Sequence, residues 1–229
     1  MKTIGLLGGM SWESSVEYER LINTEVRRRL GGTHSADLVI RSYDFAEIEK
    51  LQRLDAWEEA GGLLAADAAR LEAAGAQLIV LCTNTMHRVA PVIEAAITVP
   101  FLHIADATAA AVERAGLTRL ALLGTSYTME QDFYRGRLTA RGLDIRIPER
   151  ADRQMVHRVI FDELVRGEVR EASRRQFLAV IERMVAAGAE GVIAGCTEIE
   201  LLLPPEAVAC SYFPTTALHA RAAVEAALA

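Results

Sequence analysis

Two short segments of the chain place a cysteine and hydroxyl side chains directly after a run of apolar residues. The first is Leu-Cys-Thr-Asn-Thr-Met-His at 81–87, and the second is Gly-Cys-Thr-Glu at 195–198. A free thiol has a pKa of about 8.5, which nearby positive dipoles lower, so such a group can exchange protons. In an α/β protein, residues at the carboxyl ends of strands face the ligand. The two segments therefore predict two facing half-sites.

The similarity between the two halves of the chain extends beyond these segments. TIGLLGG at 3–9 and TRLALLGT at 118–125 both have the form of an apolar strand that ends in a turn. A similar length of chain separates the first from Thr83 and the second from Cys196. This spacing indicates an internal duplication of about 110 residues per unit, which is a normal domain size.

Strand and helix patterns alternate along the chain. Strands are predicted at 3–8, 37–43, 77–82, 99–104, 119–124, 143–147, 190–195 and 208–213. Helices are predicted at 11–30, 45–74, 106–115 and 171–187, each followed by glycine, and an Ala-rich helix is expected at the end. Such alternation is typical of parallel sheets with helices on both faces.

The predicted fold class is therefore α/β, with two similar lobes related by a pseudo-twofold duplication. Each lobe has a parallel sheet flanked by helices, and the active site is expected in the cleft between the lobes. We assign residues 1–98 plus 211–229 to the first lobe and residues 99–210 to the second.

Composition excludes several classes of protein. Hydrophobic residues make up 51% of the chain, no apolar run approaches the roughly 18 residues of a membrane span, and the N-terminus lacks a signal-peptide pattern. We expect a cytoplasmic protein without membrane contact. The net charge of −6 offers no basic surface for nucleic acid, and the basic run at 27–29 is typical of a helix end. A homodimer is expected from the prevalence of dimers among oligomers.

The three cysteines are too few and too scattered for a disulfide framework or a zinc site. The histidines also lack the spacing of metal ligands, so no metal is expected. Cys210, inside an apolar stretch, is interpreted as a small hydrophobic residue.

The ordered motifs GLLGGMS, Asn-Thr-x-His and Gly-Cys-Thr-Glu resemble those of the aspartate/glutamate racemases, which are amino-acid racemases without a cofactor. The resemblance covers essentially the whole chain. It implies a small amino-acid substrate, no pyridoxal phosphate, and a two-base mechanism in which one thiol from each lobe flanks the α-carbon. One thiol removes the α-proton and the other returns a proton from the opposite face.

The first motif departs from the family pattern at the catalytic position. The family's first cysteine immediately precedes the Asn-Thr pair, whereas here that position is Thr83 and the cysteine is Cys82. A shift of one residue along a strand turns the side chain to the other face, so Cys82 is expected in the core. The resemblance places Cys196 on the second catalytic position. A hydroxyl is a much weaker base than a thiolate, and in the family the second-lobe thiol acts on the L-enantiomer. The resemblance therefore implies a racemase biased toward the L-enantiomer.

Other residues near these motifs are candidates for binding the substrate. Hydroxyl and amide donors would stabilise the charge that forms when the α-proton leaves. The full set of candidate binding residues is Met10, Ser11, Gln52, Asn84, Thr85, Thr125, Thr197 and Glu198.

Several of these assignments have a structural alternative. The glycine turn before Ser11 is as consistent with turn geometry as with ligand contact, and Thr125 is also a candidate helix cap. Racemases of this family often place an arginine after the second strand to hold the distal carboxylate. Here Gln52 is the substitute and Lys50 the charged alternative, unless both simply lie on a solvated helix face. Glu198 orients the substrate ammonium or adjusts the thiol pKa, unless it is simply a first-turn helix acid. His87 is more consistent with a supporting position than with direct chemistry.

Two other functions fit the same features. Superfamily relatives with one retained cysteine are decarboxylases or isomerases, although the polar Asn84–Thr85 pair argues against the apolar pocket that a decarboxylase needs. A two-lobe protein that binds an amino acid without turnover is the second alternative. Loss of function on Cys196→Ser separates an enzyme from a pure binding protein.

Overall fold

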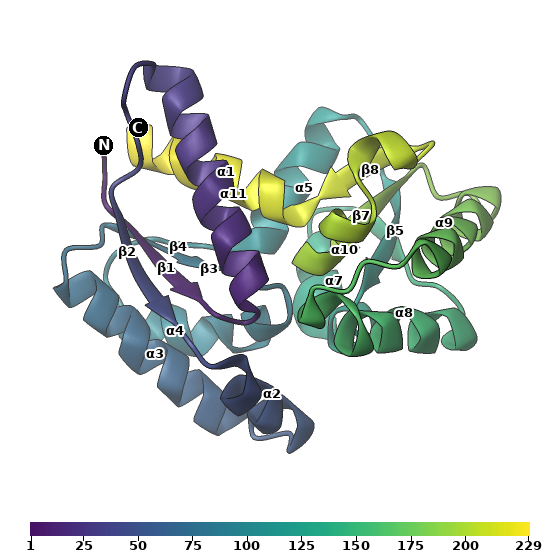
Figure 1. Cartoon of the computed structure of the whole chain (residues 1–229), viewed down its shortest axis with the longest axis horizontal. Coiled ribbons are helices and arrows are strands. Elements are labelled where there is room, and N and C mark those ends of the chain that lie inside the picture. Colours follow the sequence, from purple (N-terminus) through teal and green to yellow (C-terminus); the bar gives the residue numbers. More distant parts are fainter. The chain divides into compact units, whose positions relative to one another are not determined.

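The computed structural model describes residues 1–229, and the chain divides into two units (Figure 1). Unit 1 comprises Met1–His103 and His219–Ala229, and unit 2 comprises Ile104–Leu218. Both predicted boundaries between the lobes lie earlier in the chain than the boundaries between the units. Residues 99–103 belong to unit 1, and residues 211–218 belong to unit 2. The reason is strand pairing: the last strand of each repeat pairs with the strand that carries the Cys-Thr motif of the same unit.

Unit 1 contains a four-stranded parallel sheet with the order β2-β1-β3-β4. Its elements are β1 (Ile4–Gly8), α1 (Trp12–Leu30), β2 (Leu38–Ser42), α2 (Phe45–Arg53), α3 (Trp57–Ala73), β3 (Leu78–Leu81), η1 (Thr85–Val89), α4 (Ala90–Ala96), β4 (Phe101–Leu102) and the larger part of α11 (Thr215–Leu228).

Unit 2 repeats this topology with the order β6-β5-β7-β8, also entirely parallel. Its elements are α5 (Ile104–Arg114), β5 (Arg119–Gly124), α6 (Ser126–Glu130), α7 (Asp132–Thr139), β6 (Asp144–Arg146), α8 (Arg150–Asp162), η2 (Leu164–Arg166), α9 (Glu171–Ala186), β7 (Gly191–Gly195), α10 (Thr197–Leu202), η3 (Pro205–Ala207), β8 (Ser211–Pro214) and the start of α11. The matching strand orders agree with the predicted duplication.

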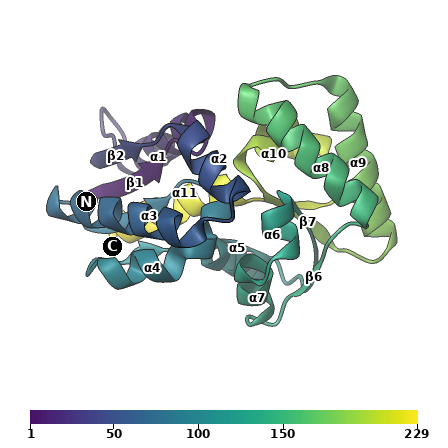
Figure 2. The same ribbon diagram turned by 90° about the horizontal axis from the view of Figure 1, so that it is seen from below.

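Helices cover both faces of each sheet, as the alternating pattern predicts. In unit 1, the apolar faces of α1 and α11 pack on alternate residues of β1 and β3, and α3 packs with α4. In unit 2, α8 and α9 lie side by side over β5 and β7, while α5 and α7 cover the opposite face (Figure 2). The central strands β1, β3 and β7 are buried along their whole length, which explains their continuous apolar sequences.

Helix α1 has a clear start and stop. Ser11 caps its first turn by accepting a hydrogen bond from the backbone amide of Ser14 at 3.4 Å, and Gly31 ends it at φ 76°. The positive φ of Gly31 favours glycine because a side chain would be strained there. The bounds of this helix therefore follow from the two residues that the sequence pattern indicates.

The predicted helix over 45–74 is wrong, because the structure contains two helices there, α2 and α3. Asp55 lies between them at φ 55°, a left-handed conformation that an α-helix cannot contain. The Asp55 carboxylate accepts a hydrogen bond from the Trp57 indole nitrogen. The 13-residue helix α8 was not assigned individually from the sequence.

The turn after β1 depends on glycine for steric reasons. Gly9 has φ 82°, and a Cβ built on it would lie 2.2 Å from the backbone nitrogen of Tyr43. This close approach accompanies a hydrogen bond from the Tyr43 amide to the Gly8 carbonyl at 3.1 Å. The Gly9 amide itself donates to Ser15 Oγ at 2.6 Å. The turn is therefore packed tightly against the end of β2. The Gly9 amide is already occupied by an intramolecular hydrogen bond.

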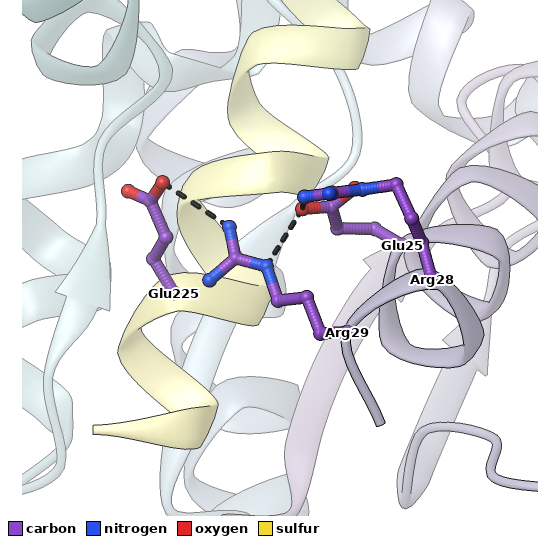
Figure 3. A network of polar contacts seen from close by, with 4 residues as sticks. All are labelled: Glu25, Arg28, Arg29 and Glu225. Carbon is purple, nitrogen blue, oxygen red and sulfur yellow. Dashed lines mark hydrogen bonds and ion pairs between the residues drawn. The ribbon is translucent and has the colours of Figure 1, made fainter. Parts of the chain in front are cut away.

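An ion-pair network connects the end of α1 to α11 (Figure 3). Glu25 accepts hydrogen bonds from the Arg28 guanidinium at 2.7–2.8 Å and from Arg29 Nε at 2.7 Å. Arg29 also reaches Glu225 at 3.2 Å. The hydrogen bond from Arg28, with help from Arg29, lowers the pKa of Glu25 to about 2. Arg28 and Arg29 of the basic run thus belong to an intramolecular network at a helix end.

None of the helices combines the length and the apolar character that a membrane span requires.

Gly9→Ala is expected to lower the free energy of unfolding by more than about 3 kcal/mol, because it adds a backbone clash to a conformation that strains any side chain by about 1–3 kcal/mol. Gly75→Ala is the matched control, since Gly75 has φ 101° but open space around its Cβ position. Urea denaturation measures both. Equal losses for the two variants would contradict the role of the Tyr43 contact.

Glu25→Gln is expected to lower the free energy of unfolding by at most about 1 kcal/mol at pH 7, because pairs at the protein surface contribute little. Since folding lowers the pKa of Glu25, its contribution is present above pH 4.5 and is lost as the pH falls toward 2. Urea denaturation at pH 7, 5 and 3 should show the variant converging on the wild type. Glu94→Gln, at an exposed carboxylate of α4, is the control and should show no such convergence.

Candidate active site

Strand register shows which residues of the two motifs are equivalent. In unit 1 the last leucine of β1 lies opposite Leu81, and in unit 2 the last leucine of β5 lies opposite Ala194. Because β1 and β5 are the matching strands of the duplication, Leu81 corresponds to Ala194. Two residues further along the chain stand Thr83 and Cys196. The counterpart of Cys196 in the fold is therefore Thr83, not Cys82.

Cys82 lies in the apolar core of unit 1. Its side chain is fully buried in the cluster that also contains Leu78 and Val80, the residues at alternate positions of the same strand. Burial raises the pKa of the Cys82 thiol far above its usual range. The alternation of β3 thus continues to Cys82, as the sequence pattern predicts, and this thiol has no access to a ligand.

Thr83 begins the turn that leaves β3, and a buried histidine holds its backbone. The Thr83 amide donates to the Leu81 carbonyl at 2.9 Å, and His87 Nδ1 donates to the Thr83 carbonyl at 2.7 Å. His87 packs against the ring of His103 with centroids 4.5 Å apart. His87 is buried and supports the turn through the hydrogen bond from Nδ1 to the backbone.

The other predicted residues of unit 1 are all buried near the carboxyl edge of its sheet. Asn84 and Thr85 follow Thr83 into η1. The amide nitrogen of Gln52, at the end of α2, donates to the thioether of Met86 at 3.1 Å, which brings α2 against η1. Lys50 is exposed on α2. The structure therefore associates Gln52, and not Lys50, with the Thr83 segment.

Met10 and Ser11 also follow the carboxyl end of a strand, but Ser11 has a structural task. Its hydroxyl caps α1, and its carbonyl accepts a hydrogen bond from Ser15 Oγ at 3.1 Å. Met10 is buried beside it. Turn geometry is thus sufficient to explain why this motif contains glycine and serine.

In unit 2, the Cys196 thiol donates a hydrogen bond to Glu198. The Sγ–Oε2 distance is 2.9 Å, and the two residues are only 7% and 4% exposed. Cys196 has an extended backbone and immediately precedes α10, which starts at Thr197. Burial, followed by the negative charge of Glu198, raises the pKa of the Cys196 thiol well above its usual value. The surroundings of Cys196 thus favour the thiol over the thiolate.

Thr125 caps α6, which is the structural role that the sequence also allowed for it. Its hydroxyl accepts a hydrogen bond from the Thr128 amide at 3.3 Å, and its side chain is buried at the carboxyl end of β5. Thr197, also buried, is the first residue of α10. Both hydroxyl residues lie at the same edge of the sheet as Cys196, because β5 and β7 are parallel neighbours.

Two threonines that the sequence pattern did not single out lie at the start of α11, close to β7 and α10. Thr215 Oγ1 donates to the Ala194 carbonyl at 2.7 Å, and the Thr216 amide donates to Glu200 Oε1 at 2.7 Å. These bonds connect the start of α11 to β7 and α10. Their signal in the sequence is a pair of threonines between a proline and an Ala-rich helix, which resembles an ordinary helix start.

A cavity of about 340 Å³ in unit 2 contains none of the predicted site residues. Its lining is mainly aliphatic, from α9 and the segment before β8, and it includes Cys210. Burial raises the pKa of Cys210. No group of three or more His, Cys, Asp and Glu side chains is arranged to hold a metal ion. The candidate proton-transfer groups therefore remain Cys196 in unit 2 and Thr83 at the equivalent register position of unit 1.

Comparisons with known proteins agree on one family. The model of the Asp/Glu/Hydantoin racemase family matches residues 7–223. The structure of a candidate Asp/Glu racemase from Yersinia pestis is 50% identical with a TM-score of 0.93, and that of an aspartate racemase homologue from Pyrococcus horikoshii is 32% identical with a TM-score of 0.85. Both alignments cover 100% of each chain. Aspartate racemase from Picrophilus torridus shares the fold, with 19% identity, a TM-score of 0.77, and coverage of 99% of this chain and 94% of that one.

Cys82→Ser is expected to lower the free energy of unfolding by about 1–3 kcal/mol, because it places a hydroxyl in an apolar core. Cys210→Ser, at a partly exposed position, should have a smaller effect. Urea denaturation of the two variants checks the difference. If Cys82→Ser were neutral, the core position of this residue would be wrong.

Proposed function

Because the chain belongs to the Asp/Glu/Hydantoin racemase family, whose members are isomerases, we propose that it racemises an acidic amino acid, aspartate or glutamate. The reaction removes the proton from Cα and returns a proton from the opposite face, and we propose that it needs no cofactor. Cys196 is the catalytic base and Thr83 the group on the other face.

The observation that carries this proposal is the register equivalence of Thr83 and Cys196. A two-base racemase needs one proton-transfer group from each half of the duplicated fold. Unit 2 provides a thiol at this position and unit 1 provides a hydroxyl, while the remaining thiol of unit 1 is buried in the core. The Thr83 hydroxyl and the Cys196 thiol thus occupy equivalent positions but differ greatly in acidity.

This mismatch supports a bias toward the L-enantiomer. A thiol with a normal pKa of about 8.5 forms a thiolate far more readily than an aliphatic hydroxyl ionises. In the family, the thiol of the second half acts on the L-enantiomer, which assigns Cys196 to L-substrates. Thr83 donates a proton to the developing carbanion, or holds the substrate carboxylate, but it is too weak a base to start the reaction from a D-substrate efficiently.

The choice of an acidic substrate rests on the similar proteins and on Gln52. Two of the proteins compared above are described as an aspartate racemase or its homologue. Gln52 is buried beside η1, and its amide nitrogen donates to a thioether, which is a weak acceptor. A substrate carboxylate would be a better acceptor for that amide. Asn84, Thr85, Thr125 and Thr197 are proposed to bind the α-carboxylate, on which the negative charge collects.

We also propose that the enzyme acts in the cytoplasm as a homodimer. Its three cysteines are unpaired, which agrees with a reducing compartment. Closed twofold dimers are the commonest oligomers of soluble proteins. Sedimentation velocity tests the dimer directly.

Incubation with L- and D-aspartate and L- and D-glutamate in heavy water, without an added cofactor, should give faster α-deuteration of the L-substrates. NMR measures the exchange, and chiral chromatography measures the opposite enantiomer. Cys196→Ser should slow exchange from the L-substrate by about 100-fold or more, because the general base is lost. Thr83→Cys should increase exchange from the D-substrate.

Cys82→Ser is the matched control for Cys196→Ser, and its exchange rates should stay within about twofold of the wild type. Equal rates from D- and L-substrates in the wild-type protein would contradict the bias. Exchange that survives Cys196→Ser would contradict the assigned base. Release of carbon dioxide without racemisation would indicate a decarboxylase, and binding of an amino acid without any exchange would indicate a binding protein.

A further inference from the structure

The Cys196 thiol and the Glu198 carboxylate form a buried donor–acceptor pair at the start of α10. The Sγ–Oε2 distance is 2.9 Å, and the pair lies two residues apart within one turn of chain. A carboxylate accepts protons and cannot donate one, so the proton in this hydrogen bond belongs to sulfur. We propose that Glu198 accepts the Cys196 proton and thereby generates the thiolate that removes the α-proton of the L-substrate, an inference that rests on the proposed function.

The electrostatics of the pair require the proton to move to Glu198 if the thiolate is to form. A thiolate beside an ionised carboxylate would place two negative charges about 3 Å apart in a buried site, and such a pair holds one proton between its members. Burial and the Glu198 charge both raise the pKa of Cys196, so loss of the proton to bulk water is disfavoured. Transfer to Oε2 neutralises the carboxylate at the moment when sulfur becomes charged.

The backbone at the start of α10 favours the thiolate once it has formed. A hydrogen bond from the Glu198 amide to sulfur lowers the pKa of Cys196, in opposition to the effect of the side chain of the same residue. After the transfer, this amide still points at a charged sulfur while the neutral carboxyl group no longer repels it. Glu198 therefore provides a carboxylate that can accept the thiol proton and a backbone amide that stabilises the resulting thiolate.

The complete cycle conserves protons. The Sγ–H bond breaks as an Oε2–H bond forms on Glu198, and the thiolate then takes the α-proton while the Cα–H electron pair moves into the substrate carboxylate. A proton returns to Cα from the opposite face, where we place the Thr83 hydroxyl, and water replaces that proton. Glu198 finally releases its proton to water, which restores the thiol–carboxylate pair.

The other charged groups around α10 have different partners. Glu200, on the same helix, also raises the pKa of Cys196, but its carboxylate accepts a hydrogen bond from the Thr216 amide. Arg174 donates to the Leu202 carbonyl at the far end of α10. Glu200→Gln keeps an acceptor for the Thr216 amide and leaves the Cys196–Glu198 hydrogen bond intact. It is therefore the matched control, because it removes a negative charge near the thiol without removing the proton acceptor.

The test measures thiol reactivity and catalysis in the same Glu198→Gln variant. Iodoacetamide alkylation of Cys196, followed by peptide mass spectrometry from pH 6 to 9, should be about tenfold faster at pH 7.5 than in the wild type, which corresponds to a thiol pKa lower by about one unit. In contrast, kcat for α-deuteration of the L-substrate should fall about 100-fold with little change in KM. A residue with a purely structural role would not raise thiol reactivity while lowering kcat.

Glu200→Gln should change alkylation by less than about threefold and kcat by less than about twofold. Glu198→Asp keeps a carboxylate, so its kcat should fall less than that of Glu198→Gln. If the glutamine variant does not fold, the kcat and the alkylation rate of Glu198→Asp still test the proposal. Unchanged or increased kcat in Glu198→Gln would overturn the proposal, and so would a rise in KM alone, which would indicate ammonium binding. Slower alkylation would overturn it as well. If wild-type protein exchanged no α-proton at all, the proposed function itself would fail, while alkylation would still report the hydrogen bond.

Discussion

Because every strand in both sheets pairs in parallel, the carboxyl ends of β1 and β3 lie at one edge in unit 1, and those of β5 and β7 lie at one edge in unit 2. Thr83 and Cys196 immediately follow this edge. Parallel pairing needs a helical crossover after each strand, and these helices bury both faces of the sheets. Polar side chains therefore gather at the strand ends, where the backbone leaves the core. The arrangement of the candidate site is a consequence of this constraint.

Within that common plan, the duplicated units have diverged in the chemistry that they present. The equivalent positions hold a hydroxyl in one unit and a thiol in the other, while Cys82 has become a core residue equivalent to a glycine of unit 2. Their supports differ too. A histidine fixes the backbone of Thr83, whereas a carboxylate contacts the Cys196 side chain itself. The first arrangement holds a turn in place, and the second adds to the effect of burial in raising the pKa of a thiol.

The Cys196–Glu198 contact also changes how the thiol should be understood. A cysteine that precedes a helix is often expected to have a low pKa, because the helix amides favour the thiolate. Here burial, followed by the adjacent negative charge of Glu198, raises the pKa of the thiol instead. Such a group acts as a base only if its proton has a nearby acceptor. In the proposed mechanism, Glu198 in the first turn of α10 is that acceptor, and it allows Cys196 to act as the base for L-substrates.

The sequence alone was sufficient to predict the eight strands, their parallel character and the duplication, because buried parallel strands are short apolar runs bounded by turns. The family resemblance, in which the catalytic position directly precedes the Asn-Thr pair, indicated that Thr83, and not Cys82, corresponds to Cys196. The sequence did not indicate the break at Asp55, where one residue in a left-handed conformation interrupts a helical pattern. It also assigned β4 and β8 to the wrong units, because strand pairing is a long-range choice.

Only the tertiary structure decided how the side chains around the thiol are used. A glutamate two residues after a cysteine is equally consistent with a solvated helix acid, a ligand for an ammonium group and a partner of the thiol. Burial removes the first possibility, and the 2.9 Å contact shows that Glu198 is a hydrogen-bond partner of the thiol. The distinction depends on side-chain direction and on the exclusion of water, and neither quantity is encoded in the spacing of two residues along a chain.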